Sequence, residues 1–389
     1  GYTDQAVDPR TAAGPDDPRL ATWEGVLPGF DVALDLRDDH TPWLQWLAQR
    51  GHDTAPGCEA LLATEGERSA EQSLSAFLTD HAVEWIEAQD QPWFAHLSYW
   101  RPHPPYAAAG HWSAAYSPDA VELPIAPAEH RHPMHDFALA LAASAAPTDE
   151  AGLRHLRAQY YGMISEVDDQ LGRVWDVLAR TGQFDDTVIV VVSDHGEMLG
   201  DHGLKEKLGY WEQSYHVLGI IRDPRLPDAH GSVVDAFTEN VDVMPTICEA
   251  IGIDVPAQCD GFPLTPFLSG QAPPRWRDAT HWEYDWRAMM IATAPHEWPW
   301  DRVLERQHLA VHRDERLAYV QFGDGTWRCF DLVADPTWRT EVVDADVVLP
   351  LAQRLLTWRS RHADRTLADL VLGPDGGGRW PPMPAGWGA

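Results

Sequence analysis

The chain has 389 residues, of which 44% are hydrophobic and 23% charged, and its formal net charge at pH 7 is −31. That length and composition suit a globular protein with one large α/β core and a smaller appended unit. The negative charge argues against nucleic acid or an anionic membrane as partner, because both would be repelled, and no apolar run approaches the roughly 18 residues of a membrane-spanning helix.

The basic residues are strongly biased in type. The chain contains only two lysines, Lys205 and Lys207, against 27 arginines, which is the 29 basic residues minus these two. A GC-rich genome favours arginine codons, but it does not explain why both lysines lie in one short loop. Lysine is a compact point charge and arginine a planar fork, so a position that requires a point charge would retain lysine.

The first 150 residues alternate between loops and short regular elements. The apolar patch 42–50, which ends at a glycine, predicts a short helix, and apolar residues at three- and four-residue spacing predict a second helix over 69–89. The aromatic-rich run 92–100 predicts a short strand that ends at the following Pro-rich segment. Residues 106–150 show no clear periodicity, which predicts a long irregular segment on the surface.

The central region has the clearest pattern. A helical stripe covers 153–181, and the β-branched run 186–193 predicts a strand buried on both faces of a parallel sheet. A second buried strand is expected at 217–221 and a further helix at 242–251. Helix, turn and buried strand in this order indicate an open α/β sheet, mainly parallel, with helices on both faces.

The sequence pattern changes from about residue 278. Short aromatic-rich strands at 281–286, 308–322 and 327–332 and a helix at about 346–362 predict a small antiparallel α+β unit. We therefore expect three parts, namely an α/β domain over 1–277, an α+β subdomain over 278–372 and a Gly/Pro-rich tail over 373–389.

The candidate chemistry lies where the central β-branched run ends, at Asp194 and His195. In an open α/β sheet, ligands bind beyond the carboxyl ends of the strands. Adjacent strand residues point to opposite faces, so these two side chains can share one metal only if the strand has already turned, for which Gly196 provides. A carboxylate and an imidazole suit Ca²⁺, Mn²⁺ or Zn²⁺, and at least one further carboxylate must come from elsewhere.

The longer strings around this pair resemble the sulfatase family of the alkaline phosphatase superfamily. The resemblance runs from the first residues to about residue 370, and it is nearest to the branch of arylsulfatases and phosphonate monoester hydrolases. Several motifs in the same order are far more specific than any one of them. The motifs are Gly1–Asp4, Ser98–Pro105, Tyr161–Leu171, Asp194–Leu204 with Lys207–Tyr210, Asn240–Thr246 with Cys259–Gly261, and Trp282–Trp286.

The resemblance implies a fold and a set of roles. The fold is an alkaline-phosphatase-like sandwich. Asp194 and His195 would bind the metal, for which Ca²⁺ or Mn²⁺ is favoured and Zn²⁺ is the alternative. His103 would contact the transferred group or protonate the leaving oxygen, and Lys207 would bind the sulfuryl or phosphoryl oxygens. Tyr2 and Thr3 match a substrate-binding segment loosely. The substrate would be a small anionic ester, and a homo-oligomer is compatible with the sequence.

The pattern departs from the family at the nucleophile. The family uses a formylglycine in a Cys/Ser-x-Pro-x-Arg motif near its N-terminus, and these 389 residues contain no such motif. None of the four cysteines stands in that setting, and their scatter predicts free thiols rather than disulfides or a zinc site. They are Cys58, Cys248, Cys259 and Cys329.

Two functional classes therefore compete. The first is a hydrolase whose nucleophile lies on an N-terminal segment absent from this sequence, so that the chain alone hydrolyses neither sulfate nor phosphate esters. The second is a non-catalytic remnant that binds only anions or a partner. The intact set of Asp194, His195, His103 and Lys207 favours the hydrolase. No signal-peptide pattern follows residue 1, which favours a cytoplasmic over a secreted location.

Overall fold

The computed structural model describes residues 30–36, 40–256, 259–286 and 306–362, and the backbone of 371–372 and 378–379. The chain forms two compact units. Unit 1 comprises Gly1–Pro124 and Pro147–Asp185, and unit 2 comprises Ile125–Ala146 and Asp186–Ala389. None of the helices in the described ranges is both long and apolar enough to cross a membrane.

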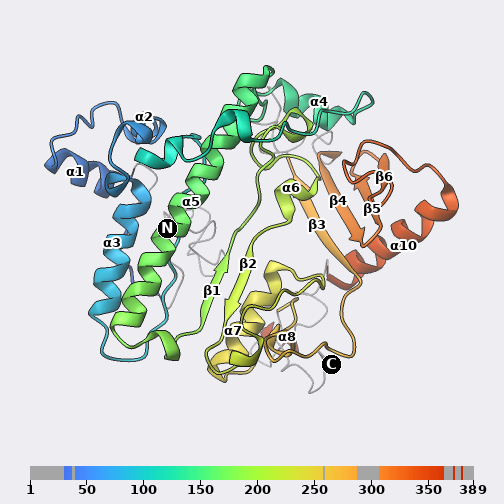
Figure 1. The fold of residues 1–389 in the computed structure, drawn as a ribbon. Helices are drawn as coiled ribbons and strands as arrows, with labels where there is room; N and C mark the ends of the chain where they lie inside the picture. Colours follow the sequence, from blue (N-terminus) through green and yellow to red (C-terminus); the bar gives the residue numbers. More distant parts are fainter. Residues whose placement is uncertain are drawn as a thin grey trace. The chain divides into compact units, whose positions relative to one another are not determined.

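Unit 1 is helical in its described part. In Figure 1 its longest helix, α5, lies alongside α3, and the two are in contact. Both begin at side-chain caps, because Ser73 accepts a hydrogen bond from the amide of Ala76, and Asp149 from that of Gly152. The helices are α1 (Thr41–Gln49), α2 (Cys58–Ala63), α3 (Leu74–Glu87) and α5 (Glu150–Arg180). The predicted helices at 42–50, 69–89 and 153–181 are thus confirmed.

The strand predicted over 92–100 is wrong, because the structure assigns no strand there. The segment has no ladder partner among the described residues. Two of its apolar side chains, Phe94 and Leu97, are 56% and 37% exposed. A strand needs a neighbour to satisfy its backbone groups, so residue composition alone does not make one.

Unit 2 contains the central strands, β1 (Ile189–Val192) and β2 (Gly219–Arg222). They pair antiparallel, with Val192 opposite Gly219. The expectation of parallel pairing is therefore not met by the central strands that the structure describes. The physical reason is that the connecting loop stays at the carboxyl end of β1, so β2 begins beside the end of β1. The expected burial on both faces is also wrong, since Val192 and Ile220 are 44% and 51% exposed.

Short helices surround these strands in sequence. Helix α4 lies within the segment predicted to be an irregular excursion. It begins at Pro133, whose missing amide proton is not needed at a helix start, and the His132 ring accepts a hydrogen bond from the amide of Met134. The helices of this part are α4 (Pro133–Ala140), α6 (Glu212–Tyr215), α7 (Val243–Ile251) and α8 (Thr265–Leu268).

The C-terminal part of unit 2 is an antiparallel sheet with the strand order β3-β4-β5-β6, and α10 packs on β4 and β5. This confirms the expected antiparallel sheet. The run 308–322, predicted as one strand, is two strands joined by a turn in which the Asp314 carboxylate accepts the amides of Arg316 and Leu317. The elements are β3 (Ala279–Asp285), β4 (His308–Asp314), β5 (Leu317–Phe322), β6 (Trp327–Asp331), α10 (Ala345–His362), β7 (Val371–Leu372) and β8 (Gly378–Arg379).

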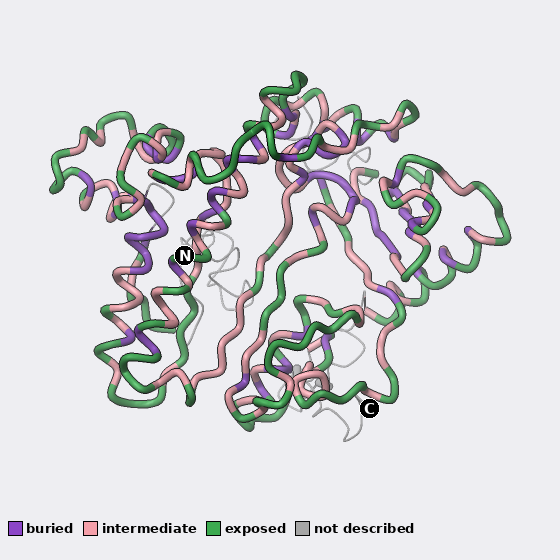
Figure 2. Tube along the Cα trace, viewed as in Figure 1, coloured by how far each residue is buried: buried purple, intermediate pink, exposed green. Residues whose placement is uncertain are grey.

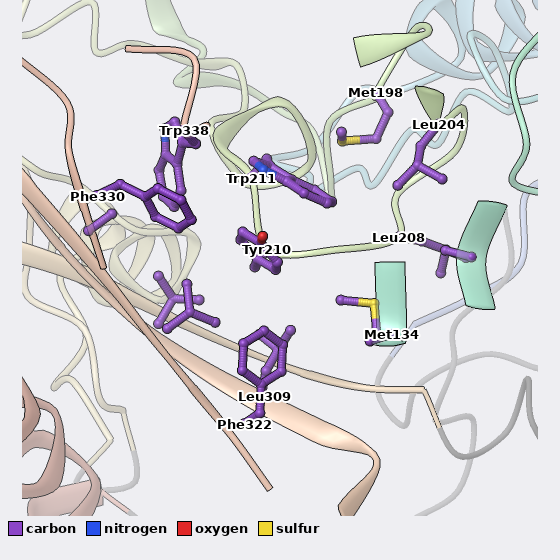
Figure 3. Close-up of a cluster of buried hydrophobic side chains, with 14 of the residues drawn as sticks. Met134, Met198, Leu204, Leu208, Tyr210, Trp211, Leu309, Phe322, Phe330 and Trp338 are labelled. Atoms are coloured by element: carbon purple, nitrogen blue, oxygen red, sulfur yellow. The ribbon is translucent and has the colours of Figure 1, made fainter. Parts of the chain in front are cut away.

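The β3–β6 sheet separates two hydrophobic cores. Tyr319 and Cys329 face α10, where they pack with Leu351. The opposite face, with Val311 and Phe322, packs against the loop that follows β1. Figure 3 shows this second core, in which Met198, Leu204, Leu208, Tyr210 and Trp211 of the loop meet Leu309 and Phe322 of the sheet. In Figure 2 the middle strands of the sheet are largely buried, whereas β1 and β2 are not.

Candidate active site

The site begins where β1 stops. The Ser193 hydroxyl donates a hydrogen bond to the carbonyl of His195 at 2.6 Å, and Asp194 Oδ1 accepts the amide of His195 at 3.0 Å. These contacts turn the chain out of the strand within three residues. Asp194 and His195 therefore lie just beyond the carboxyl end of β1, as the sequence predicted.

A close backbone approach fixes this turn. The amides of Gly196 and Glu197 donate to the carbonyls of Ser214 and Gln213 at 2.8 and 2.7 Å. A Cβ at residue 196 would lie 2.1 Å from the Gln213 carbonyl oxygen. Only glycine fits this approach, because real Cβ atoms do not come so close to another atom.

The two candidate metal ligands face the same region. His195 Nδ1 donates to the Gly196 carbonyl at 2.7 Å, so the lone pair of Nε2 remains available to a ligand. Nε2 lies 3.7 Å from Asp194 Oδ2, and the Asp194 side chain is 85% exposed. The strand has thus turned before these residues, as a shared metal requires. A hard carboxylate oxygen and a neutral imidazole nitrogen fit a divalent ion.

This pair does not complete a metal site by itself. Among the described residues, no group of three or more His, Cys, Asp or Glu side chains is arranged to hold a metal ion. The further carboxylate that the sequence analysis requires therefore stays a prediction, as do the metal-binding roles of Asp194 and His195.

Lys207 lies on the loop that continues directly from this pair. The amide of Met198 donates to the Glu206 carbonyl at 3.0 Å, and the amide of Glu206 donates to Glu197 Oε1 at 2.5 Å. These bonds bring the backbone that precedes Lys207 beside residues 197 and 198. Lys207 is half-buried and is followed by the buried Leu208, so its loop is held by the core rather than by solvent contacts.

A second support reaches the site from far along the chain. Asn240 Nδ2 donates to the Ser193 carbonyl at 2.8 Å. The adjoining Asp242 is fully buried, pairs with the Arg277 guanidinium and accepts the amide of Phe262 at 2.8 Å. The motif around Asn240 stood out in the sequence only as part of a family resemblance. Its contact with residue 193 spans 47 positions, and no local pattern reports such a contact.

His103 belongs to unit 1 and is held by Arg101. That arginine is 2% exposed and forms a buried ion pair with Glu65. Its guanidinium also donates to the carbonyls of His103 and Pro105 at 2.9 and 2.6 Å. His103 Nδ1 donates to the Pro104 carbonyl at 2.8 Å. Arg101 was not among the predicted site residues, although an arginine ahead of a Pro-rich turn is a usable signal for a support of that turn.

Two sets of predicted roles are not tested by these contacts. The roles that the resemblance gives to His103 in unit 1, and to Asp194, His195 and Lys207 in unit 2, stay predictions. Tyr2 and Thr3 lie outside the described residues, so their substrate-binding role also stays a prediction.

Comparison with known proteins shows which family this fold resembles. The family model "Sulfatase" matches residues 33–253, and the model "N-sulphoglucosamine sulphohydrolase, C-terminal" matches residues 200–361. The chain is 35% identical to the multifunctional alkaline phosphatase superfamily protein PehA of Trinickia caryophylli, over 97% of this chain and 79% of that protein. It is 29% identical to the choline-sulfatase of Rhizobium meliloti, but it spans only 54% of that relative's length.

Solved structures agree with the sequence relatives. The phosphonate monoester hydrolase of Agrobacterium radiobacter superimposes with a TM-score of 0.85 at 38% identity, covering 98% of this chain and 81% of that one. The enzyme of the same name from Silicibacter pomeroyi gives 0.80 at 31% identity, covering 98% and 80%. The predicted alkaline-phosphatase-like fold class is thereby confirmed. With a family model over more than half of its length and relatives above 30% identity, the chain belongs to the sulfatase family of the alkaline phosphatase superfamily.

Proposed function

We propose that this chain carries the metal-binding and leaving-group part of a hydrolase for sulfate esters or related phosphate and phosphonate esters. One observation carries the proposal. His195 donates its Nδ1 proton to the Gly196 carbonyl and leaves Nε2 free, 3.7 Å from a carboxylate oxygen of Asp194, at the carboxyl end of β1. The names of the relatives, which include sulfatases and phosphonate monoester hydrolases, give the class of ester.

The proposal assigns distinct tasks to the chain's own residues. Asp194 and His195 hold a divalent ion, which supplies Lewis-acid stabilisation of an ester oxygen when bound. Lys207 binds the remaining sulfuryl or phosphoryl oxygens as a point charge, and a preorganised cation stabilises charge that grows in the transition state. His103 gives a proton to the leaving oxygen. A net charge of −31 makes local positive charge necessary for any anionic substrate.

The nucleophile is the part that these residues do not supply. No Cys/Ser-x-Pro-x-Arg motif occurs in the 389 residues. We propose that a formylglycine from polypeptide outside them completes the site. The chain alone would then not hydrolyse the ester.

The test compares the 389-residue chain with a longer chain that restores a Cys-x-Pro-x-Arg motif. The longer chain should hydrolyse 4-nitrophenyl sulfate or 4-nitrophenyl phenylphosphonate in the presence of Mn²⁺ or Ca²⁺, and His195→Ala should abolish this turnover. The longer chain should also bind Mn²⁺, as measured by electron paramagnetic resonance, and the 389-residue chain should hydrolyse neither ester. Turnover by the 389-residue chain that His195→Ala abolishes would refute the external nucleophile. Failure of the longer chain to bind Mn²⁺ and to hydrolyse either ester would instead favour the non-catalytic remnant.

A further inference from the structure

The Glu197 side chain makes an unusual pair of contacts beside the candidate site. Its Oε1 accepts the amide of Leu199 at 3.3 Å and the amide of Glu206 at 2.5 Å. The two amides belong to opposite sides of the loop that begins at the candidate metal ligands and returns at Lys207. A single carboxylate oxygen thus holds both sides of this loop together.

Both amides belong to residues in a disfavoured backbone conformation. Leu199 has a φ of 48° and Glu206 a φ of 65°, so both lie in the left-handed region. Residues other than glycine rarely adopt this region, because their Cβ then lies too close to the following carbonyl oxygen. Such conformations persist only where the surroundings enforce them, and here Glu197 accepts the amides of both residues.

The two lysines of this loop differ in their support. The amide of Lys205 donates to the Ser144 carbonyl at 2.8 Å, so its backbone has an anchor besides Glu197. Lys207 follows Glu206, whose amide Glu197 accepts and whose carbonyl accepts the amide of Met198 at 3.0 Å. The backbone angles of Glu206, between these two held peptides, set the direction in which the chain enters residue 207.

We propose that Glu197 is the positioning residue for Lys207. Its carboxylate fixes the Glu206 residue in the left-handed conformation and thereby places the Lys207 ammonium group where it can bind an anion. The inference deepens the proposed function and rests on the anion-binding role given there to Lys207. It assigns Glu197 no contact with metal or substrate.

The scarcity of lysine makes the inference directly measurable. Reductive methylation with ¹³C-formaldehyde labels two side chains, Lys205 and Lys207, together with the terminal amine, so the NMR spectrum is simple. Lys205→Arg assigns the signals. In Glu197→Ala the Lys207 methyl signal should shift while that of Lys205 stays in place, and the Kd for inorganic phosphate read from the Lys207 signal should rise roughly tenfold, as for loss of a supporting partner.

Matched variants keep the test decisive. Glu197→Gln retains an oxygen acceptor and should keep the wild-type Lys207 signal, whereas Glu197→Asp retains the charge but draws the oxygen back by one methylene and should resemble Glu197→Ala. Glu197→Asp therefore replaces Glu197→Ala if the alanine variant does not fold. If both Glu197→Ala and Glu197→Asp keep the wild-type Lys207 signal and the wild-type Kd for phosphate, the inference is overturned. If phosphate moves neither lysine signal in the wild type, yet Glu197→Ala still shifts that of Lys207, positioning stands and the anion-binding role of Lys207 fails.

Discussion

Two β structures of unit 2 are built from similar residues but are buried to different extents. Val311 and Val320, in the middle of the β3–β6 sheet, are fully buried, whereas Val192 of β1 and Ile220 of β2 are 44% and 51% exposed. Both segments read as apolar and β-branched in the sequence. The difference shows that burial depends on the layers that cover a strand, and the β1–β2 ribbon has fewer of these among the described residues.

The comparison also shows how the candidate site obtains its rigidity. Asp194 and His195 stand at the end of the open ribbon, but the loop that follows them inserts Met198 and Trp211 into the core of the β3–β6 sheet. A two-stranded ribbon is marginally stable by itself. The sheet therefore provides the stability, and the ribbon end provides the exposed position that a substrate must reach.

The largest expected effect comes from damaging the sheet. Phe322 is 2% exposed in its core, and Phe322→Ala should lower the free energy of unfolding by about 3–5 kcal/mol. Ile220→Ala, on the open ribbon, should cost below about 1 kcal/mol. Urea unfolding followed by tryptophan fluorescence measures both. Equal losses would show that the ribbon is covered in solution and that the contrast between the two structures does not hold.

The next effect tests the chemistry at the ribbon end. In the longer, active chain, Lys207→Arg should lower kcat/KM by about 10²–10³, on the scale of one lost transition-state contact, because a planar guanidinium fits the oxygens poorly. Lys205→Arg is the matched control and should retain activity. Steady-state kinetics on an aryl sulfate or phosphonate decide the matter. Wild-type kinetics for Lys207→Arg would remove both its assigned role and the argument from lysine scarcity.

The dependence of stability on pH distinguishes a buried histidine from an exposed one. Burial lowers the pKa of His135 to about 4, and its Nε2 donates to the His202 carbonyl at 2.8 Å. The unfolded chain takes up this proton near pH 6.5. Stability is therefore fully present above about pH 6.5 and is lost as the pH falls toward 4, by about 1–3 kcal/mol. His135→Gln, measured by unfolding at several pH values, should flatten this slope. The exposed His130→Gln should not, and equal slopes in all three proteins would contradict the assignment.

The sequence predicted some features of this molecule well because they are local. The 3.6-residue stripe of α5 and the end of the β-branched run before Asp194 both lie within short windows. Strand direction is not encoded in such a window, so the antiparallel pairing of β1 and β2 was missed. Charged residues 313–316 interrupt the apolar pattern of 308–322, but no Gly, Pro or Asn marks a turn there, so the turn between β4 and β5 was missed. The supports of the site, Arg101 to the His103 loop and Asn240 to Ser193, depend on tertiary contacts.

The smallest expected effect concerns that last support. Asn240 donates to the Ser193 carbonyl at 2.8 Å, while the Ser193 hydroxyl donates to the His195 carbonyl at 2.6 Å. Removing the amide frees the end of the ribbon without touching either candidate metal ligand. In the longer chain, Asn240→Ala should therefore weaken Mn²⁺ binding roughly tenfold, the lower range for outer partners of metal ligands. It should leave the urea midpoint nearly unchanged because Asn240 is exposed. Isothermal titration calorimetry measures the affinity, with Thr357→Ala on α10, which loses a similar exposed hydrogen bond, as the control. Equal Mn²⁺ affinities in both variants would mean that the sheet alone, through Met198 and Trp211, sets the geometry of the site.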